Sequence, residues 1–198
     1  MNFASTLIFA SNNRHKAAEI HSILGEQFQI ITLADAGIEI DIPEPHDTIA
    51  ENAAEKSSVI NQLTGKNCFG EDTGLEVEAL GGAPGVKSAR FAGEKATAEE
   101  NMVKLQELMS GQSNRKARFV TVISLRLNGE HHLFSGVCSG TIAELPAGKD
   151  GFGYDPLFIP DGSSQSFAEM TMEEKNKFSH RKKAVQAMVA FLKQVEKK

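Results

Sequence analysis

The chain has 198 residues, of which 40% are hydrophobic and 24% charged, and its formal net charge is −5. A chain of this length buries roughly 70% of the surface that its unfolded form exposes, so it needs no disulfide or metal to build a core. The acidic balance provides no general attraction to nucleic acid or to an anionic membrane surface. We therefore expect a single domain over residues 1–198 that binds neither, and that holds any anion through local groups.

The two cysteines, Cys68 and Cys138, lie in apolar runs and show neither a Cys-x-x-Cys nor a zinc-ligand spacing. Buried free thiols in a reducing compartment are the better interpretation. The first residues, MNFASTLIFA, have no basic lead and only a short apolar stretch, which predicts neither a signal peptide nor a transmembrane helix. The cytoplasm is the expected location.

Short apolar runs alternate with helical periodicity in the first third of the chain. A strand is predicted at Thr6–Ala10, and a helix follows with Ala17 and Ile20 on its apolar face. A second strand is predicted at Phe28–Leu33, and a proline-broken acidic loop follows it. Asp47 or Thr48 can then cap a helix that runs to about Leu63.

The rest of the chain predicts a short buried strand at Cys68–Glu71 and irregular backbone from Gly74 onwards, because glycines are frequent there. Thr97 begins a capping-box helix. A β-hairpin is predicted from Arg118–Leu127 and His131–Val137, since the intervening Asn-Gly suits a type I′ turn, and the second arm is expected to run towards Leu145. The last helix is strongly amphipathic. These elements predict an α/β domain with a mixed, twisted sheet flanked by helices.

Four stretches carry polar residues that the fold alone does not require. The first is SNNRHK at residues 11–16, between a strand and a helix. Backbone N–H groups and the helix dipole at such a turn favour a bound phosphate, and Lys16 adds a positive charge. An ordinary helix N-cap is the alternative interpretation, and the chain has no Walker A loop.

The second stretch groups the acids Glu44, Glu51, Glu71 and Asp72 with Lys56. Carboxylates 4 Å apart repel by about 4 kcal/mol at an effective dielectric constant near 20, so they usually gather only around a cation. Oxygen ligands suit magnesium or manganese. Surface positions are the alternative for Glu44 and Glu51. The pair Glu71-Asp72 is harder to explain in that way, because it closes an apolar strand, where α/β sheets often place ligand-binding groups.

The third stretch is GKDGFGYDP at residues 148–156, and the fourth comprises Lys175, Ser179, His180 and Arg181. Glycines on both sides of Phe152 let the backbone approach a ligand while the ring stacks on it, although a plain glycine-rich turn is the alternative. Ser179 can cap the last helix, but cations at a helix start oppose the dipole preference. That cost indicates an anionic or carbonyl-bearing ligand, with a structural histidine as the alternative.

Taken in order, these stretches resemble the Ham1 family of inosine and xanthosine triphosphate pyrophosphatases over essentially the whole chain. Each motif alone is weak evidence, and their shared order makes the resemblance specific. The motifs are Ser/Thr-x-Asn-x-x-Lys at 11–16, Glu-Asn-Ala at 51–53, Glu-Asp-Thr-Gly-Leu at 71–75, Gly-Gly-Ala-Pro-Gly at 81–85, Ser-Ala-Arg at 88–90, Gly-Phe-Gly-Tyr-Asp-Pro at 151–156 and Ser-His-Arg at 179–181.

The resemblance implies a nucleotide cleft and a Mg²⁺-dependent hydrolase that cleaves a nucleoside triphosphate between its α and β phosphates, releasing monophosphate and pyrophosphate. The implied substrates are ITP, dITP and XTP, purine nucleotides with a 6-keto group that would be removed from the nucleotide pool. Donors placed at O6 would discriminate against a 6-amino base, because donor would then face donor. The resemblance also implies a homodimer, for which the apolar hairpin and Gly81–Phe91 are the expected interface.

Carried over residue by residue, the resemblance makes Asp72 the proton acceptor that activates water, with Lys56 as a second catalytic residue. Glu44, Glu71 and Asp72 are the implied Mg²⁺ ligands. The implied substrate contacts are Ser11, Asn12, Asn13 and Lys16 at the phosphates, Thr73 beside Asp72, Phe152, Gly153, Tyr154 and Asp155 at the base and sugar, and Lys175, His180 and Arg181 at the base edge and nearby phosphate oxygens.

Two departures from the family pattern stand out. Bacterial relatives often have Asp-Asp-Ser-Gly where this chain has Glu-Asp-Thr-Gly at 71–74, and Thr-Gly-Asn where it has Ser-Asn-Asn at 11–13. Both changes keep the chemistry, but the longer Glu71 leaves open which acid touches the metal. Two other functions also stay open: a Maf-like pyrophosphatase acting on other modified nucleotides, and a nucleotide-binding sensor without turnover. A purely structural module would leave Glu71-Asp72 unexplained.

Overall fold

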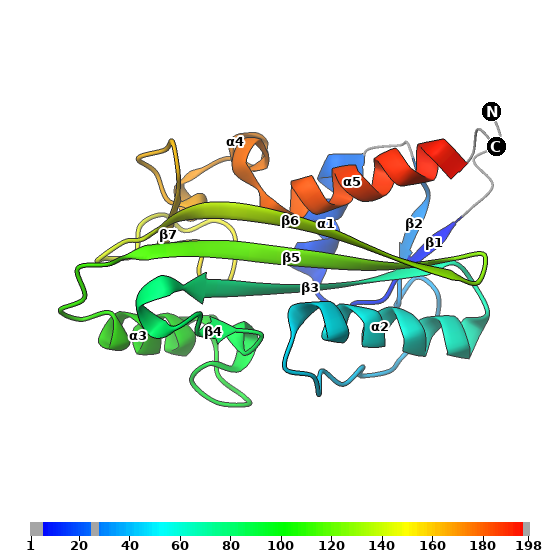
Figure 1. Cartoon of the computed structure of the whole chain (residues 1–198), viewed down its shortest axis with the longest axis horizontal. Coiled ribbons are helices and arrows are strands. Elements are labelled where there is room, and N and C mark those ends of the chain that lie inside the picture. Colours follow the sequence, from blue (N-terminus) through cyan, green and yellow to red (C-terminus); the bar gives the residue numbers. More distant parts are fainter. Residues whose placement is uncertain (1–5, 25–27, 196–198) are drawn as a thin grey trace. The chain divides into compact units, whose positions relative to one another are not determined.

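The computed structural model describes residues 6–24 and 28–195, so that residues 1–5 of the N-terminal segment lie outside it. Among the described helices, none combines the length and the apolar content that crossing a membrane requires. In chain order (Figure 1) the helices and strands are β1 Leu7–Phe9, α1 Arg14–Leu24, β2 Ile30–Thr32, α2 Ile49–Thr64, β3 Cys68–Val77, β4 Pro84–Gly85, α3 Ala98–Leu108, β5 Lys116–Leu127, β6 Glu130–Ile142, β7 Phe158–Pro160, α4 Met172–Phe178 and α5 His180–Val195.

The strands form one mixed sheet in the order β2-β1-β3-β5-β6-β7, with β4 paired to β3. β1 is parallel to both of its neighbours, whereas β4 and β7 pair antiparallel. The predicted α/β class is therefore confirmed. The chain divides into two compact units, and the long strands β3, β5 and β6 contribute to both. The prediction of one domain stays a prediction. Unit 1 comprises Met1–Asp72, Thr121–Gly136 and Arg181–Lys198, and unit 2 comprises Thr73–Val120 and Val137–His180.

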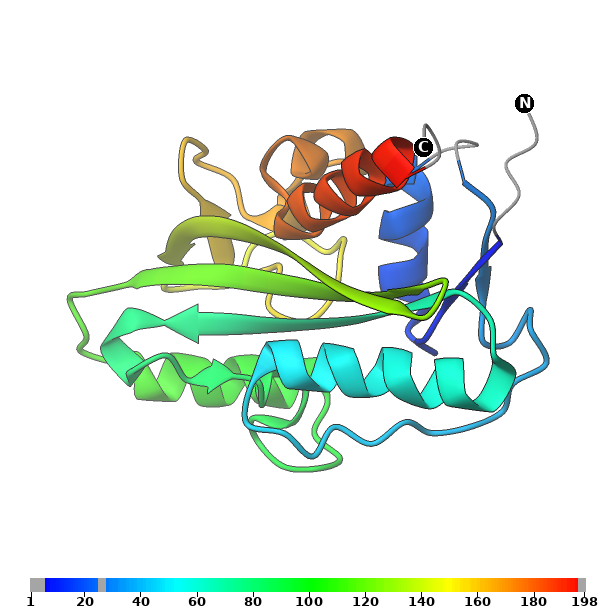
Figure 2. The same ribbon diagram turned by 45° about the vertical axis from the view of Figure 1, so that its right-hand side comes forward.

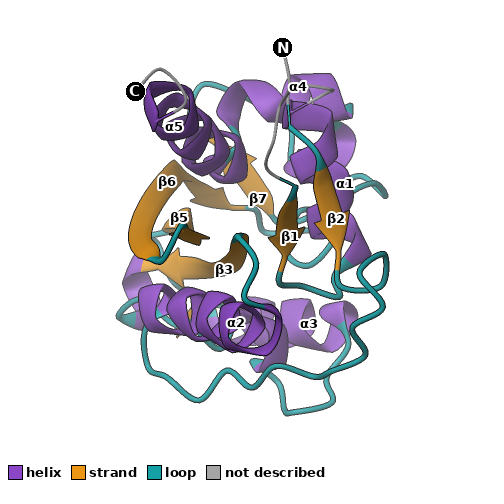
Figure 3. Ribbon diagram, turned by 90° about the vertical axis from the view of Figure 1, so that its right-hand side faces the viewer, coloured by secondary structure: helices purple, strands orange, loops and turns teal. Residues whose placement is uncertain are grey.

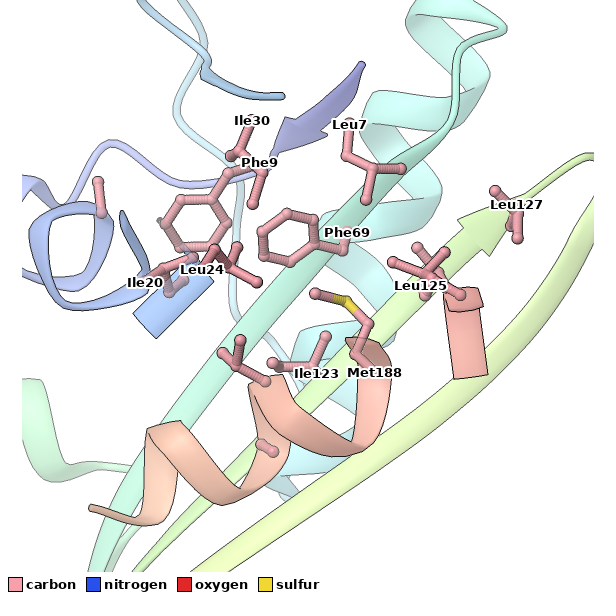
Figure 4. Packing of buried hydrophobic residues seen from close by; sticks show 14 residues of the cluster. Leu7, Phe9, Ile20, Leu24, Ile30, Phe69, Ile123, Leu125, Leu127 and Met188 are labelled. Atoms are coloured by element: carbon pink, nitrogen blue, oxygen red, sulfur yellow. The ribbon is translucent and has the colours of Figure 1, made fainter. Parts of the chain in front are cut away.

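The main core of unit 1 lies where α1 and α5 pack on β1, β3 and β5 (Figure 4). The rings of Phe9 and Phe69 stack there with centroids 4.9 Å apart, beside Ile20 of α1 and Met188 of α5. α1 also lies beside β1 and β2 in Figure 3. Aromatic stacking adds to the area that the rings bury, so these predicted apolar faces are the ones that hold unit 1 together.

A second cluster of unit 1 lies on the other face of β1 and contains Ile8, Ala10, Ile60 and Cys68. Successive side chains of a strand point to opposite faces, so Leu7 and Phe9 enter the first core and Ile8 and Ala10 the second. This explains why the strand is a continuous apolar run rather than an alternating one. α2, shown in cyan in Figure 2, covers this second face alongside β3.

Unit 2 has its own core, in which Leu75 and Val77 of β3 meet Leu105 of α3 and aromatic side chains of β5, β7 and the following segment. The ring of Phe119 makes an edge contact with Phe158, 4.7 Å between centroids, and stacks on Phe167 at 6.1 Å. Each unit therefore buries a hydrophobic cluster of its own.

The structure confirms the capped helices and the hairpin. Thr48 and Thr97 accept hydrogen bonds from the backbone N–H of the third residue of their helices. Asn128 and Gly129 have φ of 52° and 87°, as a type I′ turn requires. The second arm ends at Ile142, before the expected Leu145.

The prediction that β3 ends near Glu71 is wrong. The strand continues through Gly74 to Val77, because Leu75 and Val77 are fully buried and Leu75 pairs with Gly85 of β4. Glycine in a strand removes a packing side chain but does not break the ladder when the partner strand supplies the hydrogen bonds. Glu71 and Asp72 therefore lie within a strand rather than at its end.

Both cysteines are free and buried, as predicted. Burial raises the pKa of the Cys68 thiol to about 11, and the thiol donates a hydrogen bond to the Ser57 carbonyl at 3.2 Å. Since only the thiolate attacks, alkylation of Cys68 by iodoacetamide at pH 8 should be about 100-fold slower in the native protein than in urea. Mass spectrometry of the labelled peptide measures this ratio, and equal rates in both states would contradict the buried assignment.

Candidate functional site

Asp72 of β3 faces Lys56 of α2, and both side chains are buried. Lys56 Nζ donates to Asp72 Oδ1 at 3.0 Å and to the Glu71 carbonyl oxygen at 3.2 Å. The same ammonium group also pairs with the Glu44 carboxylate. One lysine therefore joins the loop that carries Glu44 to the strand that carries Asp72.

Gly70 makes this approach of helix and strand possible. A Cβ at that position would lie 2.4 Å from the Ala53 carbonyl oxygen and 2.8 Å from Lys56 Cβ, distances that folded proteins do not show. The absence of a side chain two residues before Asp72 thus sets how closely α2 lies on β3, and with it the position of Lys56.

Replacing Gly70 by alanine should therefore lower the free energy of unfolding by about 3 kcal/mol, the upper end for overpacking. Gly37 provides a control. It has φ of +69°, and a Cβ added there would meet no heavy atom within 4 Å, so its alanine variant should lose only about 1 kcal/mol from backbone strain. Urea unfolding compares the two, and equal losses would show that the contact with α2 is unimportant.

The charges of this group depend on each other. Burial raises the pKa of Asp72 above its ordinary value, Lys56 and Lys16 offset part of that rise, and Glu44 adds to it. Burial alone would lower the pKa of Lys56, but the carboxylates of Asp72 and Glu44 outweigh it and raise that pKa. Lys56 consequently stays charged at neutral pH, and its charge favours the ionised form of Asp72.

Glu71 belongs to a second buried network. Arg181 donates from Nε and from Nη2 to Glu71 Oε1, at 3.3 and 3.1 Å, and its Nη1 bonds to the Glu19 carboxylate. Glu71 Oε2 lies 2.8 Å from Lys16 Nζ. Arg181 is 1% exposed, so two carboxylates from distant parts of the chain compensate its desolvation. These carboxylates also explain how a helix can begin with a cation.

The SNNRHK turn forms the start of α1. Asn13 Oδ1 accepts from the Lys16 backbone N–H at 3.1 Å, so Asn13 is the N-cap of α1, and Asn12 Nδ2 donates to the Ile40 carbonyl at 3.0 Å. A hollow of about 210 Å³ opens here, lined by Ser11, Asn12, Asn13, Arg14, Ala17, Thr32 and Ala34. The cap alternative is therefore correct for Asn13, and it does not conflict with an anion at the same turn.

Glu51, considered with the acids, has a structural role. It is exposed, its N–H donates to Thr48 Oγ1 at 3.2 Å, and its carboxylate accepts from the same hydroxyl at 2.7 Å. Of the acids considered together, Glu51 thus takes part in capping the N-terminus of α2.

The third stretch and the residues of the fourth up to His180 belong to unit 2. Asp155 is 3% exposed, and its Oδ2 accepts from the Phe152 N–H at 2.9 Å and from Lys175 Nζ at 2.6 Å. Gly151 admits this carboxylate, because a Cβ there would lie 2.2 Å from Asp155 Oδ2. Lys175 Nζ lies 5.3 Å from the centre of the Phe152 ring. The loop and α4 thus hold a cation beside an aromatic face.

Two side chains of this unit that were predicted to contact the substrate, Tyr154 and His180, are buried and contact other residues of the protein. Tyr154 is buried, its hydroxyl donates to the Ser88 carbonyl at 2.8 Å, and burial raises its pKa. His180 is 2% exposed and its ring stacks on Phe119 at 4.7 Å. Ser179 follows α4, and its N–H donates to the Lys175 carbonyl at 3.0 Å. Gly153 and Thr73 are half-buried.

The described part of the chain holds no group of three or more His, Cys, Asp or Glu side chains arranged to bind a metal ion. One atom nevertheless fits a cation. Asp72 Oδ2 is buried and has no hydrogen-bond partner among the described residues, while Oδ1 is held by Lys56. Mg²⁺ typically takes one or two carboxylates and completes its shell with water and substrate phosphates. The residues present therefore suit a Mg²⁺ that arrives with a nucleotide, and Glu44, Glu71 and Asp72 as a complete ligand set remain a prediction.

Two residues near the site do not stand out in the sequence: Glu19, which pairs with Arg181, and Asn52, whose amide bonds to the backbone of His46. Glu19 lies one helical turn after Lys16, between the apolar residues Ala17 and Ile20, where a solvated acid is unexpected. That position is the available signal. Asn52 stands in the sequence only as part of Glu-Asn-Ala, and nothing local indicates what its amide binds.

The family model of the Ham1 family matches residues 7–191 of the chain. The chain belongs to the Ham1 family. Its resemblance to that family, inferred from the ordered motifs, is confirmed. The roles carried over to individual residues stay predictions.

The Ham1 relatives are similar along nearly their full length. A dITP/XTP pyrophosphatase of Porphyromonas gingivalis is 50% identical, covering 94% of this chain and 96% of the relative. The protein of the same name from Flavobacterium psychrophilum is 48% identical, covering 94% and 98%. Among solved structures, the Staphylococcus aureus Ham1 protein is 36% identical with a TM-score of 0.86, covering 96% and 99%, and a HAM1 protein of Coxiella burnetii is 35% identical with a TM-score of 0.87, covering 96% and 99%.

Proposed function

We propose that this chain hydrolyses non-standard purine nucleoside triphosphates, namely dITP, ITP and XTP, to the monophosphate and pyrophosphate. The observation that carries the proposal is the Asp72 carboxylate, buried, held at one oxygen by Lys56 and without a partner at the other among the described residues. It occurs in a Ham1 chain whose relatives, at 48–50% identity, are named dITP/XTP pyrophosphatase.

In the proposed reaction, Asp72 Oδ2 accepts a proton from a water molecule whose oxygen attacks the anhydride between the α and β phosphates. The new P–O bond forms as the bridging P–O bond breaks, and pyrophosphate leaves. Lys56 favours the ionised form of Asp72, whose pKa burial raises, and orients the carboxylate through the bond to Oδ1. Lys16, at the start of α1, adds positive charge for the phosphates.

Mg²⁺ is proposed as the metal, because the available donors are carboxylate oxygens. When bound with the nucleotide, it would neutralise phosphate charge and stabilise the departing pyrophosphate. Asp72 would hold it, with Glu44 and Glu71 as further ligands. The two free, buried thiols support a reducing compartment, for which the cytoplasm is proposed.

The base would be bound by residues of unit 2. Phe152 supplies an aromatic face, and Asp155 fixes Lys175 beside it. The lysine ammonium can donate a hydrogen bond to a 6-keto oxygen, but a 6-amino group cannot accept one from it. His180 and Arg181 remain proposed contacts, although the structure engages both side chains internally.

A substrate panel tests the function. The protein is incubated with Mg²⁺ and ITP, dITP, XTP, ATP or GTP, and released pyrophosphate and orthophosphate are scored separately. We expect pyrophosphate, with kcat/KM for the keto purines ITP and XTP exceeding that for ATP by about 100-fold or more. Orthophosphate alone, or equal rates with ITP and ATP, would refute the proposal. Turnover of other modified nucleotides only would support the Maf-like alternative, and binding without turnover would support the sensor.

A homodimer is proposed on the family resemblance. The expected interface, the apolar hairpin and the stretch Gly81–Phe91, contains the exposed side chain of Leu133. Light scattering gives the mass in solution directly, and a monomer at micromolar concentration would contradict the proposal.

A further inference from the structure

Two helices of the chain begin with the same local pattern. Thr48-Ile-Ala-Glu-Asn52 opens α2 and Thr97-Ala-Glu-Glu-Asn101 opens α3. In both, threonine is the N-cap, its hydroxyl accepts from the N–H of the third helical residue, and that residue is glutamate. The asparagine that follows is buried in each case, with 0% exposure for Asn52 and 3% for Asn101. A capping box needs no such asparagine, so its burial requires another explanation.

Each asparagine binds the chain segment that precedes its helix with both ends of its amide. Asn52 Oδ1 accepts from the His46 N–H at 3.0 Å, and its Nδ2 donates to the His46 carbonyl at 3.1 Å. Asn101 Oδ1 accepts from the Ala92 N–H at 2.7 Å, and its Nδ2 donates to the Ala89 carbonyl at 3.1 Å. Both amides therefore hold a backbone segment in place through two hydrogen bonds. Asn52 holds the segment at His46, and Asn101 holds the segment at Ala89 and Ala92.

The loop held by Asn52 carries a predicted metal ligand. Glu44 lies two residues before His46, and prolines at 43 and 45 fix φ on both sides of it. With His46 anchored and the intervening backbone stiff, Glu44 has little freedom to move away from its partner Lys56. Lys56 in turn holds Asp72. The path from Asn52 to the reacting group thus runs through His46, Glu44 and Lys56.

We propose that Asn52 is a positioning residue, which holds the Glu44 carboxylate towards Lys56 and Asp72 and so towards the Mg²⁺ of the reaction. The inference rests on the proposed function, since it assigns Glu44 to that metal. Partners behind a metal ligand typically contribute about 10–100-fold to metal affinity or activity.

The test compares Asn52→Ala with Asn101→Ala. Both remove a buried amide that makes two backbone bonds at the same helical position, so both should lose comparable stability. Only Asn52→Ala should raise the Mg²⁺ concentration for half-maximal ITP hydrolysis, by about tenfold, with kcat largely restored at saturating Mg²⁺. Mn²⁺ affinity, measured by water-proton relaxation with IMP and pyrophosphate present, should fall by a similar factor. Hydrogen exchange of the His46 amide should accelerate.

Asn52→Asp provides a second variant should the alanine protein fail to fold. It is isosteric and keeps the acceptor for the His46 N–H, but it loses the donor to the His46 carbonyl, and its metal requirement should also rise. The proposal is overturned if the Asn52 variants bind Mn²⁺ within twofold of the wild type, or if Asn101→Ala shifts the metal requirement as much. A wild type that does not hydrolyse ITP would refute the proposed function alone, because Mn²⁺ affinity and His46 exchange report on Asn52 without turnover.

Discussion

The Asp72→Asn variant is expected to hydrolyse ITP with a kcat about 10²–10⁴-fold below that of the wild type, the range that general-base catalysis contributes. Asparagine keeps the shape of the side chain and can still contact Lys56, but its amide accepts no proton from water. It also offers a cation no negative charge at the position of Oδ2, which has no partner among the described residues. Steady-state kinetics with pyrophosphate detection measures the loss.

Asp47→Asn is the matched control, because Asp47 is exposed and lies in the loop before α2. This variant should retain wild-type kcat and KM. Circular dichroism and urea unfolding of Asp72→Asn are needed beside the kinetics, since Lys56 loses one of its two charged partners. Turnover within threefold of the wild type at saturating Mg²⁺ would show that Asp72 is not the proton acceptor.

The second large effect is expected on stability, at Arg181. Replacing it by methionine leaves Glu19 and Glu71 buried without their common cation, and breaking a buried ion pair in this way costs about 3–5 kcal/mol. Methionine retains much of the volume, so the loss would come from the two buried carboxylates that lose Arg181, of which Glu71 keeps Lys16, rather than from a cavity. The free energy of unfolding in urea at pH 7 gives the magnitude.

Two further variants separate that charge effect from general damage to α5. Lys183→Met alters an exposed cation two residues later and should change stability by no more than about 0.5 kcal/mol. Adding Glu19→Gln to Arg181→Met removes the charge of one buried carboxylate that has lost Arg181. The double variant should therefore recover part of the lost free energy of unfolding. A double variant no more stable than Arg181→Met, or a single variant within 1 kcal/mol of the wild type, would contradict the network as the main role of Arg181.

Much of the fold could be predicted from sequence because the signals are local. The capping box at Thr97 predicted the start of α3, Asp47 or Thr48 was the predicted cap of α2, and Asn-Gly predicted the hairpin turn; the structure has Thr48 as the cap of α2. These features depend on hydrogen bonds between residues three or four apart, so the sequence nearby is sufficient. The end of β3 could not be predicted, because a strand is completed by a partner, and β4, a strand of two residues, leaves no pattern that could reveal it.

The candidate site shows the same division. The order of the motifs indicated the Ham1 family and singled out Asp72, Glu71, Lys56 and Lys16 without any coordinates. The sequence could not show that Asn52 binds His46, because amide contacts across six residues have no characteristic pattern. Nor could the sequence show that α2 packs so closely on Gly70 that a side chain at this position would clash with it.

By itself, then, the sequence determined the family and the α/β class, and it indicated the residues of the proposed metal-assisted hydrolysis, since motif order and helical or strand periodicity are properties of neighbouring residues. Only the tertiary structure decided which charges share a buried environment. Arg181 meets Glu19 and Glu71 across more than 100 residues of sequence, and Lys56 joins Glu44 to Asp72. The physical reason is that a buried charge must find an opposite charge wherever the folded chain brings one near, and periodicity along the chain carries no record of that distance.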